Sequence, residues 1–186
     1  MKFPQLLHTR LFYSFILVLG LFWIWYSAVP ANMVTNGEIP APQKGFLAPD
    51  FTLKTLDGQT VQLSSLRGKL VLVNLWASWC PPCKAEMPAI DHIYQAYKAK
   101  GLIVLGVDST IQDTIANVST FVGDNKLSFP ILLDENGLAT RLYNIQSLPT
   151  SFFIAPDGII RDMIVGGPMS EAFLQSSVEK YLSEQH

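Results

Sequence analysis

Apolar residues gather in three runs along the chain, and the segments between them are punctuated by Pro, Gly and Asp-Gly pairs. The first run, residues 11–29, is long and uncharged, whereas residues 70–75 and 102–107 form shorter runs. Short apolar runs bounded by polar residues are typical of strands that lie inside a sheet with both faces covered. The two short runs therefore predict two buried strands.

Helical and strand patterns alternate over the rest of the chain. Apolar residues Ile111, Ile115 and Val118 recur at helical spacing, and two Asp-Gly pairs are typical of hairpin turns. Strands alternating with helices predict an α/β fold, and a closing hairpin makes its central sheet mixed. The expected elements are, in order, a hairpin at 51–53 and 60–63, a strand at 70–75, a helix at 82–100, a strand at 102–107, a helix at 111–122, a strand at 131–133, a helix at 138–143, a hairpin at 151–154 and 159–165, and a helix at 173–182.

The first apolar run has the length and the flanks of a membrane anchor. As a helix, residues 11–29 would span about 28 Å, close to the thickness of the hydrocarbon core of a bilayer. Basic residues precede the run, and the first one after it is Lys44. This asymmetry predicts that the N-terminus lies inside the cell. We therefore expect residues 1–10 to be cytoplasmic, residues 11–29 to cross the bacterial cytoplasmic (inner) membrane once, and the remainder to lie on the periplasmic, extracytoplasmic face.

A cleaved secretory signal is the alternative interpretation of this segment, because it also combines a basic start with an apolar centre. The run is longer than the apolar centre of ordinary signals, and Pro30 lies beside the candidate cleavage site, which favours an uncleaved anchor. Residues 30–47 are rich in Pro, Gly, Asn and Gln and are expected to form an extended tether. A folded domain is then expected over residues 48–186.

The distribution of charge argues against a nucleic-acid partner. The chain has 13 basic and 15 acidic residues, for a formal net charge of −2, and two of the basic residues, Lys2 and Arg10, precede the tether. The part expected to fold is therefore acidic, and it contains no basic run. Nucleic-acid binding needs a basic patch, so we expect none.

Cys80 and Cys83 are the only cysteines in the chain, and they follow the first short apolar run. A strand that leads into Cys-x-x-Cys and then a helix places a thiol at a helix N-terminus. There, backbone N–H groups and the helix dipole favour the thiolate, which is the form that attacks a disulfide. The segment therefore predicts thiol–disulfide exchange in a compartment where disulfides persist.

Three other interpretations of the cysteine pair are weaker. A structural zinc site usually needs a second Cys or His pair, and His8, His92 and His186 are not at the spacing of metal ligands. A copper chaperone would need a wider cysteine spacing and a His far downstream, near the site. A purely structural disulfide over so short a loop would remove little entropy from the unfolded state. No metal ion and no cofactor is therefore expected.

Three segments resemble the thioredoxin-like proteins, and in particular the membrane-anchored, extracytoplasmic subgroup that includes TlpA, ResA and the cytochrome c maturation protein CcmG. Residues 74–88 resemble the active-site segment of the subgroup, residues 148–154 resemble the loop with the cis-proline of the family, and residues 48–58 resemble the N-terminal hairpin. The resemblance implies a thioredoxin-like fold, a central mixed sheet flanked by helices, with an N-terminal β-hairpin and an inserted helix–strand unit before the cis-proline loop.

The resemblance also implies roles for residues around the cysteines. Cys80 is expected to attack the substrate, and Cys83 is expected to resolve the mixed disulfide. Glu86, where ResA-like proteins have a glutamate, is expected to exchange protons with the buried thiol. The buried acid of thioredoxin itself is replaced here by Asn74.

A second set of implied roles concerns the binding of a protein substrate. A cis Pro149 would expose the backbone of Leu148, which could pair in strand fashion with a bound chain. Trp79 is expected to border the same site. The tethered members of the subgroup are mostly reductases, so the resemblance implies reduction of protein disulfides. Nothing in the sequence argues for more than a monomer. Apocytochrome c is one candidate substrate, and a membrane thiol–disulfide carrier is the expected electron donor.

Two functions from other classes stay open. A peroxiredoxin-like peroxidase shares the fold and the N-terminal segment, but its active-site Pro and Thr correspond here to Val73 and Ala77. A non-catalytic, membrane-tethered assembly factor would use the groove beside Pro149 and would not need the cysteine pair.

Overall fold

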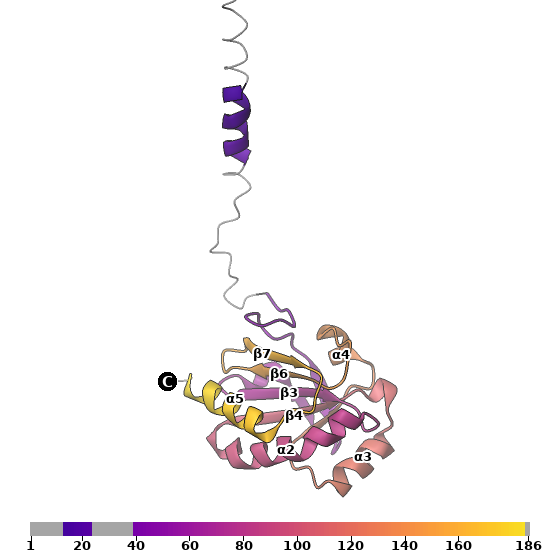
Figure 1. Ribbon diagram of the computed structural model, residues 1–186. Coiled ribbons are helices and arrows are strands. Elements are labelled where there is room, and N and C mark those ends of the chain that lie inside the picture. Colours follow the sequence, from indigo (N-terminus) through magenta and orange to yellow (C-terminus); the bar gives the residue numbers. More distant parts are fainter. Residues whose placement is uncertain (1–12, 24–38, 185–186) are drawn as a thin grey trace, which may run out of the picture. The chain divides into compact units, whose positions relative to one another are not determined.

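The computed structural model describes residues 13–23 and 39–184 (Figure 1). Residues 13–23 form an exposed helix, and residues 39–184 belong to a separate, compact unit. Among the described residues, no helix is both long and apolar enough to cross a bilayer. The expected cytoplasmic residues, both ends of the expected anchor and the first part of the tether lie outside the described residues.

Seven strands form one mixed sheet in the second unit, which confirms the expected α/β architecture. The order across the sheet is β2-β1-β5-β4-β3-β6-β7. The central strand β3 pairs in parallel with β4 and antiparallel with β6, so the closing hairpin makes the sheet mixed. The strands are β1 (Thr52–Thr55), β2 (Thr60–Gln62), β3 (Leu70–Trp76), β4 (Leu102–Asp108), β5 (Ile131–Leu133), β6 (Thr150–Ile154) and β7 (Ile160–Val165).

Helices cover both faces of this sheet (Figure 1). On one face lie α2 (Pro81–Tyr97), α3 (Ile115–Asp124) and α5 (Glu171–Ser183), and on the other lies α4 (Leu138–Leu142). Successive residues of a strand point to opposite faces. Leu72 of β3 therefore packs in the core beneath α2, whereas Val71 and Val73 pack in the opposite core. Asn74 follows in the same alternation and faces α2.

The unit inserted between β4 and β5 is present as expected, but its helix begins later than its hydrophobic spacing predicts. Thr110–Gln112 form a single 3-10 turn, and α3 begins only at Ile115, with Thr114 as its N-cap. Ile111 therefore does not lie on the face of α3, and its side chain is 55% exposed. The predicted start of the helix at Ile111 was wrong. The backbone of Asp113 is extended, which interrupts the helix, and its side chain accepts a hydrogen bond from Ser78.

Part of the expected tether, residues 39–47, lies against the folded unit. Leu47 forms isolated bridges with both Pro40 and Ile159. The Gly45 N–H donates to the carbonyl of Ile160 at the start of β7, over 2.8 Å. The folded unit therefore begins earlier than the hydrophobic pattern predicts, because backbone pairing leaves no signal in that pattern.

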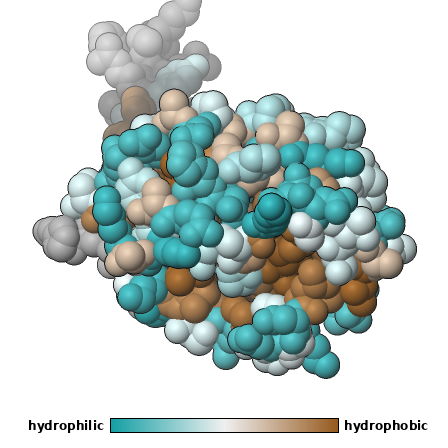
Figure 2. All heavy atoms as spheres, turned by 90° about the horizontal axis from the view of Figure 1, so that it is seen from below, coloured by the Kyte–Doolittle hydropathy of each residue, from teal (hydrophilic) through white to brown (hydrophobic). Residues whose placement is uncertain are grey.

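The surface of the folded unit carries apolar areas as well as polar ones. Figure 2 shows, on the face that points downward in Figure 1, a patch of apolar side chains bordered by polar residues.

A cavity of about 440 Å³ is lined by residues that include Tyr94, Val122, Phe129 and Ile131. Neither the cysteine segment nor residues 145–150 contribute to its lining, so this cavity is not part of the cysteine site.

Candidate redox site

The two cysteines lie where the central strand gives way to the longest helix of the folded unit. β3 ends at Trp76, a short turn follows, and Cys80 is the N-cap of α2. Cys80 and Cys83 form a disulfide, with their Cα atoms 5.3 Å apart. Both side chains are buried, Cys80 to 3% exposure and Cys83 completely. Cys80 is thus the sulfur that lies nearer to the surface, as its expected attacking role requires.

The helix N-terminus at Cys80 offers fewer donors than an ordinary one. Pro81 and Pro82 occupy the first two helical positions and carry no N–H. The Cys80 N–H donates to the carbonyl of Ala77 within the turn, over 3.2 Å. No side chain caps the helix at Cys80. The stabilisation of a Cys80 thiolate by this helix end is therefore weaker than the strand–helix geometry alone suggests.

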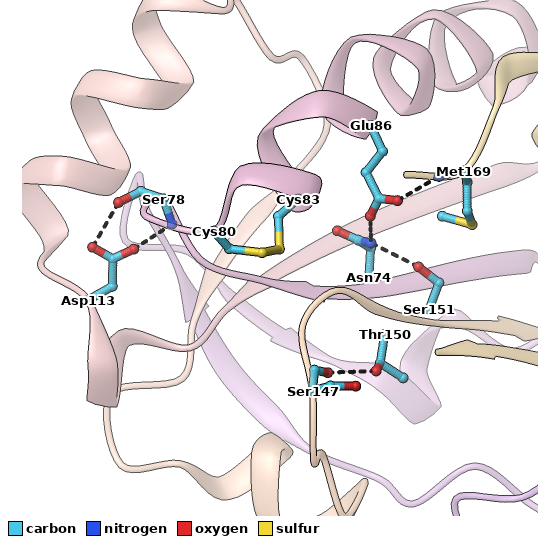
Figure 3. Close-up of a disulfide and its surroundings, with 10 residues drawn as sticks. All are labelled: Asn74, Ser78, Cys80, Cys83, Glu86, Asp113, Ser147, Thr150, Ser151 and Met169. Atoms are coloured by element: carbon cyan, nitrogen blue, oxygen red, sulfur yellow. Dashed lines mark hydrogen bonds between the residues drawn. A yellow bond between two sulfur atoms is a disulfide. The ribbon is translucent and has the colours of Figure 1, made fainter. Parts of the chain in front are cut away.

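Glu86 lies one turn beyond Cys83 and is buried completely. Its carboxylate accepts a hydrogen bond from the Asn74 side-chain amide over 2.8 Å and another from the Met169 N–H over 3.0 Å (Figure 3). The same Asn74 amide donates to the Ser151 hydroxyl over 2.8 Å. The polar network thus joins β3, α2, β6 and the segment before α5 next to the thiols.

Burial sets the protonation of this carboxyl. It raises the pKa of Glu86 above its usual range, and the hydrogen bonds from Met169 and Asn74 offset only part of that rise. Asn74 itself is incompletely satisfied, because its Oδ1 has no partner among the described residues. A buried acid with a raised pKa, one helical turn from Cys83, is suited to hold or release a proton during exchange.

The expected cis-proline loop lies next to the cysteines. The Leu148–Pro149 peptide bond is cis, as expected, and the Pro149 carbonyl accepts a hydrogen bond from Gly166 N–H over 2.8 Å. A Cβ atom at Gly167 would lie 2.7 Å from both Pro149 Cγ and Glu86 Oε2. Only glycine fits at this position, so the loop, the buried acid and the end of β7 are packed closely together.

A groove of about 190 Å³ opens beside Cys80. Trp79 and Cys80 line one side, and residues 145–148, with Leu148 among them, line the other. The remaining lining residues are uncharged: Ser109, Gln112 and Thr140. Trp79 is 52% exposed, which is unusual for a tryptophan and leaves much of its ring available. The groove thus gathers Trp79, Cys80 and Leu148, which the sequence predicts as parts of one site.

Sequence reasoning missed a second set of contacts, made by residues 109–113. Asp113 accepts hydrogen bonds from the Ser78 N–H over 2.6 Å and from the Ser78 hydroxyl over 2.9 Å (Figure 3). The Trp79 indole N–H donates to the Gln112 carbonyl over 2.8 Å. Asp113 is 35 residues from Ser78 in the chain. No local pattern indicates this pairing, and only the order of the strands in the sheet brings the two segments together.

Two further acids are buried at the same end of the sheet. Asp134 accepts hydrogen bonds from Thr140 and from the Ala139 N–H. Burial raises the pKa of Asp108 to about 7, helped by the nearby charges of Asp113 and Asp134, and one of its oxygens has no hydrogen-bond partner among the described residues. In the part of the chain that the structure describes, no group of three or more His, Cys, Asp or Glu could hold a metal ion.

The fold and the cysteine geometry agree with comparisons to known proteins. Residues 45–163 match the AhpC/TSA family. The thiol-disulfide oxidoreductase ResA of Oceanobacillus iheyensis is 39% identical over 161 residues, which cover 84% of this chain and 79% of that protein. The thioredoxin-like protein YneN of Bacillus subtilis is 40% identical over 124 residues, covering 67% and 72% of the two chains.

Solved structures show the same relationship. A thiol:disulfide interchange protein of the thioredoxin family from Chlorobium tepidum superimposes with a TM-score of 0.67 at 30% identity, covering 73% of this chain and 95% of that one. StoA from Bacillus subtilis gives a TM-score of 0.62 at 32% identity, covering 70% and 96%. The chain therefore belongs to the AhpC/TSA family of thioredoxin-like proteins and, within it, to the thiol–disulfide oxidoreductases related to ResA.

Proposed function

We propose that this protein reduces disulfide bonds of other proteins outside the cytoplasm. The observation that carries the proposal is the Cys80–Cys83 disulfide at the start of α2, with Cys80 in the lining of an uncharged groove. Two cysteines within one helical turn can alternate between a dithiol and a disulfide by thiol–disulfide exchange. A relative that is 39% identical carries the name thiol-disulfide oxidoreductase.

The proposed reaction has two exchange steps. In the dithiol form, the Cys80 thiolate attacks one sulfur of the substrate disulfide; the substrate S–S bond breaks, and one substrate thiolate leaves. Cys83 then loses its proton and attacks Cys80 Sγ, so the second substrate thiolate leaves. The substrate has gained two electrons, and the Cys80–Cys83 pair has lost them. A dithiol carrier in the membrane would return two electrons and restore the dithiol.

In this mechanism Glu86 exchanges a proton with Cys83. Glu86 lies one helical turn beyond Cys83 and is fully buried, and its raised pKa makes its carboxylate a better proton acceptor than that of an exposed acid. A buried thiol cannot release its proton directly to water, so a neighbouring acid–base group is needed. Asn74 and Met169 hold the carboxylate in place through hydrogen bonds.

The groove beside Cys80 is the proposed binding site for the substrate chain. The backbone of Leu148, next to cis Pro149, would pair with an extended segment of the substrate, while the exposed ring of Trp79 would cover the side chains of that segment. The groove lining carries no charged residue, so an uncharged segment around the substrate cysteine fits best. Apocytochrome c, which the resemblance implies, is the candidate substrate.

The proposed location is the extracytoplasmic face of the bacterial cytoplasmic membrane. The apolar residues 11–29 and the basic residues that precede them support an uncleaved anchor with its N-terminus inside. In that compartment disulfides persist, so a tethered reductant has substrates that need it. The proposed enzyme acts as a monomer.

The direction of electron flow can be tested by measuring the reduction potential of the pair in the full chain. A reductase should show a potential near or below about −270 mV, whereas about −120 mV would indicate an oxidant and contradict the proposal. The substrate can be identified with Cys83→Ser, which leaves the mixed disulfide on Cys80 unresolved. Proteins trapped on this variant in cells, and absent from a Cys80→Ser control, would be the substrates.

The two alternatives make different predictions. In a peroxidase of this family a Pro and a Thr would precede the reactive cysteine, but Val73 and Ala77 occupy those positions, and both are buried. Rapid, Cys80-dependent consumption of hydrogen peroxide that survives Cys83→Ser would favour the peroxidase. A tethered assembly factor would keep its activity in cells when both cysteines are replaced by Ser, whereas the proposed reductase would lose it.

A further inference from the structure

Residues 109–113, at the start of the inserted unit, form hydrogen bonds with the turn that leads to Cys80. Residues 77–79 connect β3 to α2, and within the turn the Cys80 N–H donates to the Ala77 carbonyl. Four hydrogen bonds join this turn to residues 109–113: the Ser109 N–H donates to the Trp76 carbonyl over 2.9 Å, the N–H and the hydroxyl of Ser78 both donate to Asp113, and the Trp79 indole N–H donates to the Gln112 carbonyl. Residues on both sides of Ala77 are thus hydrogen-bonded to residues 109–113.

Residues 109–113 are also held by hydrogen bonds among themselves and with their neighbours in the chain. The Thr110 hydroxyl donates to the Asp108 carboxylate over 2.9 Å, and the Gln112 N–H donates to the Ser109 carbonyl over 2.8 Å. Asp113 also accepts from the N–H of Thr114, the N-cap of α3, over 2.7 Å. The Asp113 carboxylate is therefore fixed between α3 and the turn, so it can hold Ser78 in one position.

The same segment forms a wall of the groove beside Cys80. Ser109 and Gln112 line that groove together with Trp79 and Cys80. A shift of the turn would therefore change both the direction of Cys80 Sγ and the shape of the groove in which a substrate disulfide must lie. Displacements of about 1 Å at a reacting atom can cost roughly a hundredfold in rate.

We propose that Asp113 is a positioning residue for the redox reaction, acting through Ser78 to fix the turn that carries Cys80 and Trp79. The inference rests on the proposed function, because it concerns how the reductase aligns its attacking sulfur. It predicts that Asp113 matters for reaction with a folded or extended protein substrate and matters little for reaction with a small reagent that needs no groove.

The test compares Asp113→Ala with Asp113→Asn in the full chain. Alanine removes both acceptors for Ser78. Asparagine can keep both contacts with Ser78, because its carbonyl oxygen can accept from the Ser78 N–H while its amide donates to the Ser78 hydroxyl, which can also act as an acceptor. It loses only the bond from the Thr114 N–H, which shares an oxygen with that hydroxyl in the parent. We expect Asp113→Ala to lower kcat/KM for reduction of a protein disulfide such as insulin roughly tenfold, and Asp113→Asn to stay within about threefold of the parent.

A matched control exists elsewhere in the molecule. Asp91 on α2 accepts hydrogen bonds from the N–H and the hydroxyl of Ser128, each over 2.7 Å, so it makes the same pair of contacts away from the turn. Asp91→Ala should leave kcat/KM within about twofold of the parent, even if both alanine variants lower the melting temperature to a similar extent. Alkylation of Cys80 by iodoacetamide, at a pH where the thiol is fully ionised, should change by less than about twofold in every variant.

The inference is overturned if Asp113→Ala reduces insulin as fast as the parent, or if Asp91→Ala is equally slow. If Asp113→Ala does not fold, Ser78→Ala takes its place: it removes the hydroxyl contact alone, and an unchanged kcat/KM of Ser78→Ala would refute the positioning role. If the parent chain itself reduces no disulfide, the proposed function fails first. An active parent with an unaffected Asp113→Ala variant refutes the positioning role only.

Discussion

The hydrogen bond between Asn74 and Glu86 follows from the alternation of side chains along β3. Leu72, Asn74 and Trp76 all point toward α2, and Asn74 is the polar member of that row. An amide buried there needs partners, and Glu86 and Ser151 provide them. A single polar residue in an apolar strand thus determines where the buried carboxyl of the site is held.

Replacing Glu86 by Gln tests the proton-exchange role at this residue. The new side chain would still accept a hydrogen bond through its amide oxygen, so the fold should persist, but it cannot exchange a proton. We expect reduction of protein disulfides to slow roughly tenfold to a hundredfold. The measurement is kcat/KM between pH 6 and pH 8, with Glu179→Gln as control, because Glu179 pairs with Tyr97 at the opposite end of α2. A Glu86→Gln variant as fast as the parent would exclude the role.

Asp108 should make the stability of the protein depend on pH. Its pKa is raised from an ordinary value of 3.8 to about 7, mainly by burial, so between these pH values the folded state binds more protons than the unfolded state. The free energy of unfolding must then fall as pH rises through this window, by at most about 1.4 kcal/mol per pH unit from this one group. Glu86, whose pKa is also raised, contributes with the same sign.

Asp108→Asn should therefore flatten the dependence of stability on pH. Urea unfolding of the oxidised chain at several pH values between about 4.5 and about 7.5 measures the slope in parent and variant. Asp57→Asn is the control, because Asp57 is exposed and the Thr55 hydroxyl lowers its pKa, so its contribution has the opposite sign. Equal slopes in the parent and in Asp108→Asn would show that Asp108 titrates normally.

At the scale of elements, hydrophobic patterning predicts most strands of the sheet. It fails where contacts between distant parts of the chain determine the end of an element. The expected strands at 70–75 and 102–107 are each extended by one residue only, in β3 and β4. These added residues are Trp76 and Asp108, which lie beside the site. The start of α3 is mispredicted because periodicity over Ile111 and Ile115 carries no information on the partner of Asp113. A Thr directly before Ile115, a common N-cap residue, is the local signal that corrects it.

Local patterns also predict only part of the candidate site. Cys80, Cys83 and Glu86 stand close together in the sequence, so one motif predicts all three, and the resemblance predicts the cis bond before Pro149. The contacts of Asp113 and Asn74 depend on the order of strands in the sheet and on which face each side chain takes. Those are properties of the assembled sheet, and a single sequence does not state them.

Replacing Gly106 in β4 by Ala tests how closely the inserted unit packs on the sheet. A Cβ atom there would lie 2.8 Å from Phe129 Cε2 and 2.9 Å from Ile131 Cδ1, so Gly106→Ala should destabilise the protein by roughly 1–3 kcal/mol. Gly123 in α3 is the matched control, because a Cβ atom at that position would have nothing within 4 Å. Gly123→Ala should be neutral or stabilising by up to about 1 kcal/mol. Urea unfolding measures both, and equal stabilities would mean that the side chains of Phe129 and Ile131 can shift aside at little cost.

For the whole molecule, the proposed location follows from chemistry as much as from hydropathy. A Cys-x-x-Cys pair in the cytoplasm would share its compartment with abundant thiol reductants, and protein disulfides to reduce would be rare there. Outside the cytoplasm, substrates are plentiful, but electrons must be delivered across the membrane. A tether that keeps the folded unit near a membrane carrier raises the effective concentration of that donor.

This arrangement predicts the outcome of protease treatment of intact spheroplasts that express the full chain. Because Lys2 and Arg10 precede the apolar run and no basic residue follows it until Lys44, residues 39–184 should face outward and be digested, while a cytoplasmic marker survives. A chain that lacks residues 1–38 should stay inside and be protected, with its cysteines largely reduced when trapped by alkylation in cells. Protection of the full chain would place the pair in the cytoplasm, where a tethered reductase of extracytoplasmic disulfides could not work.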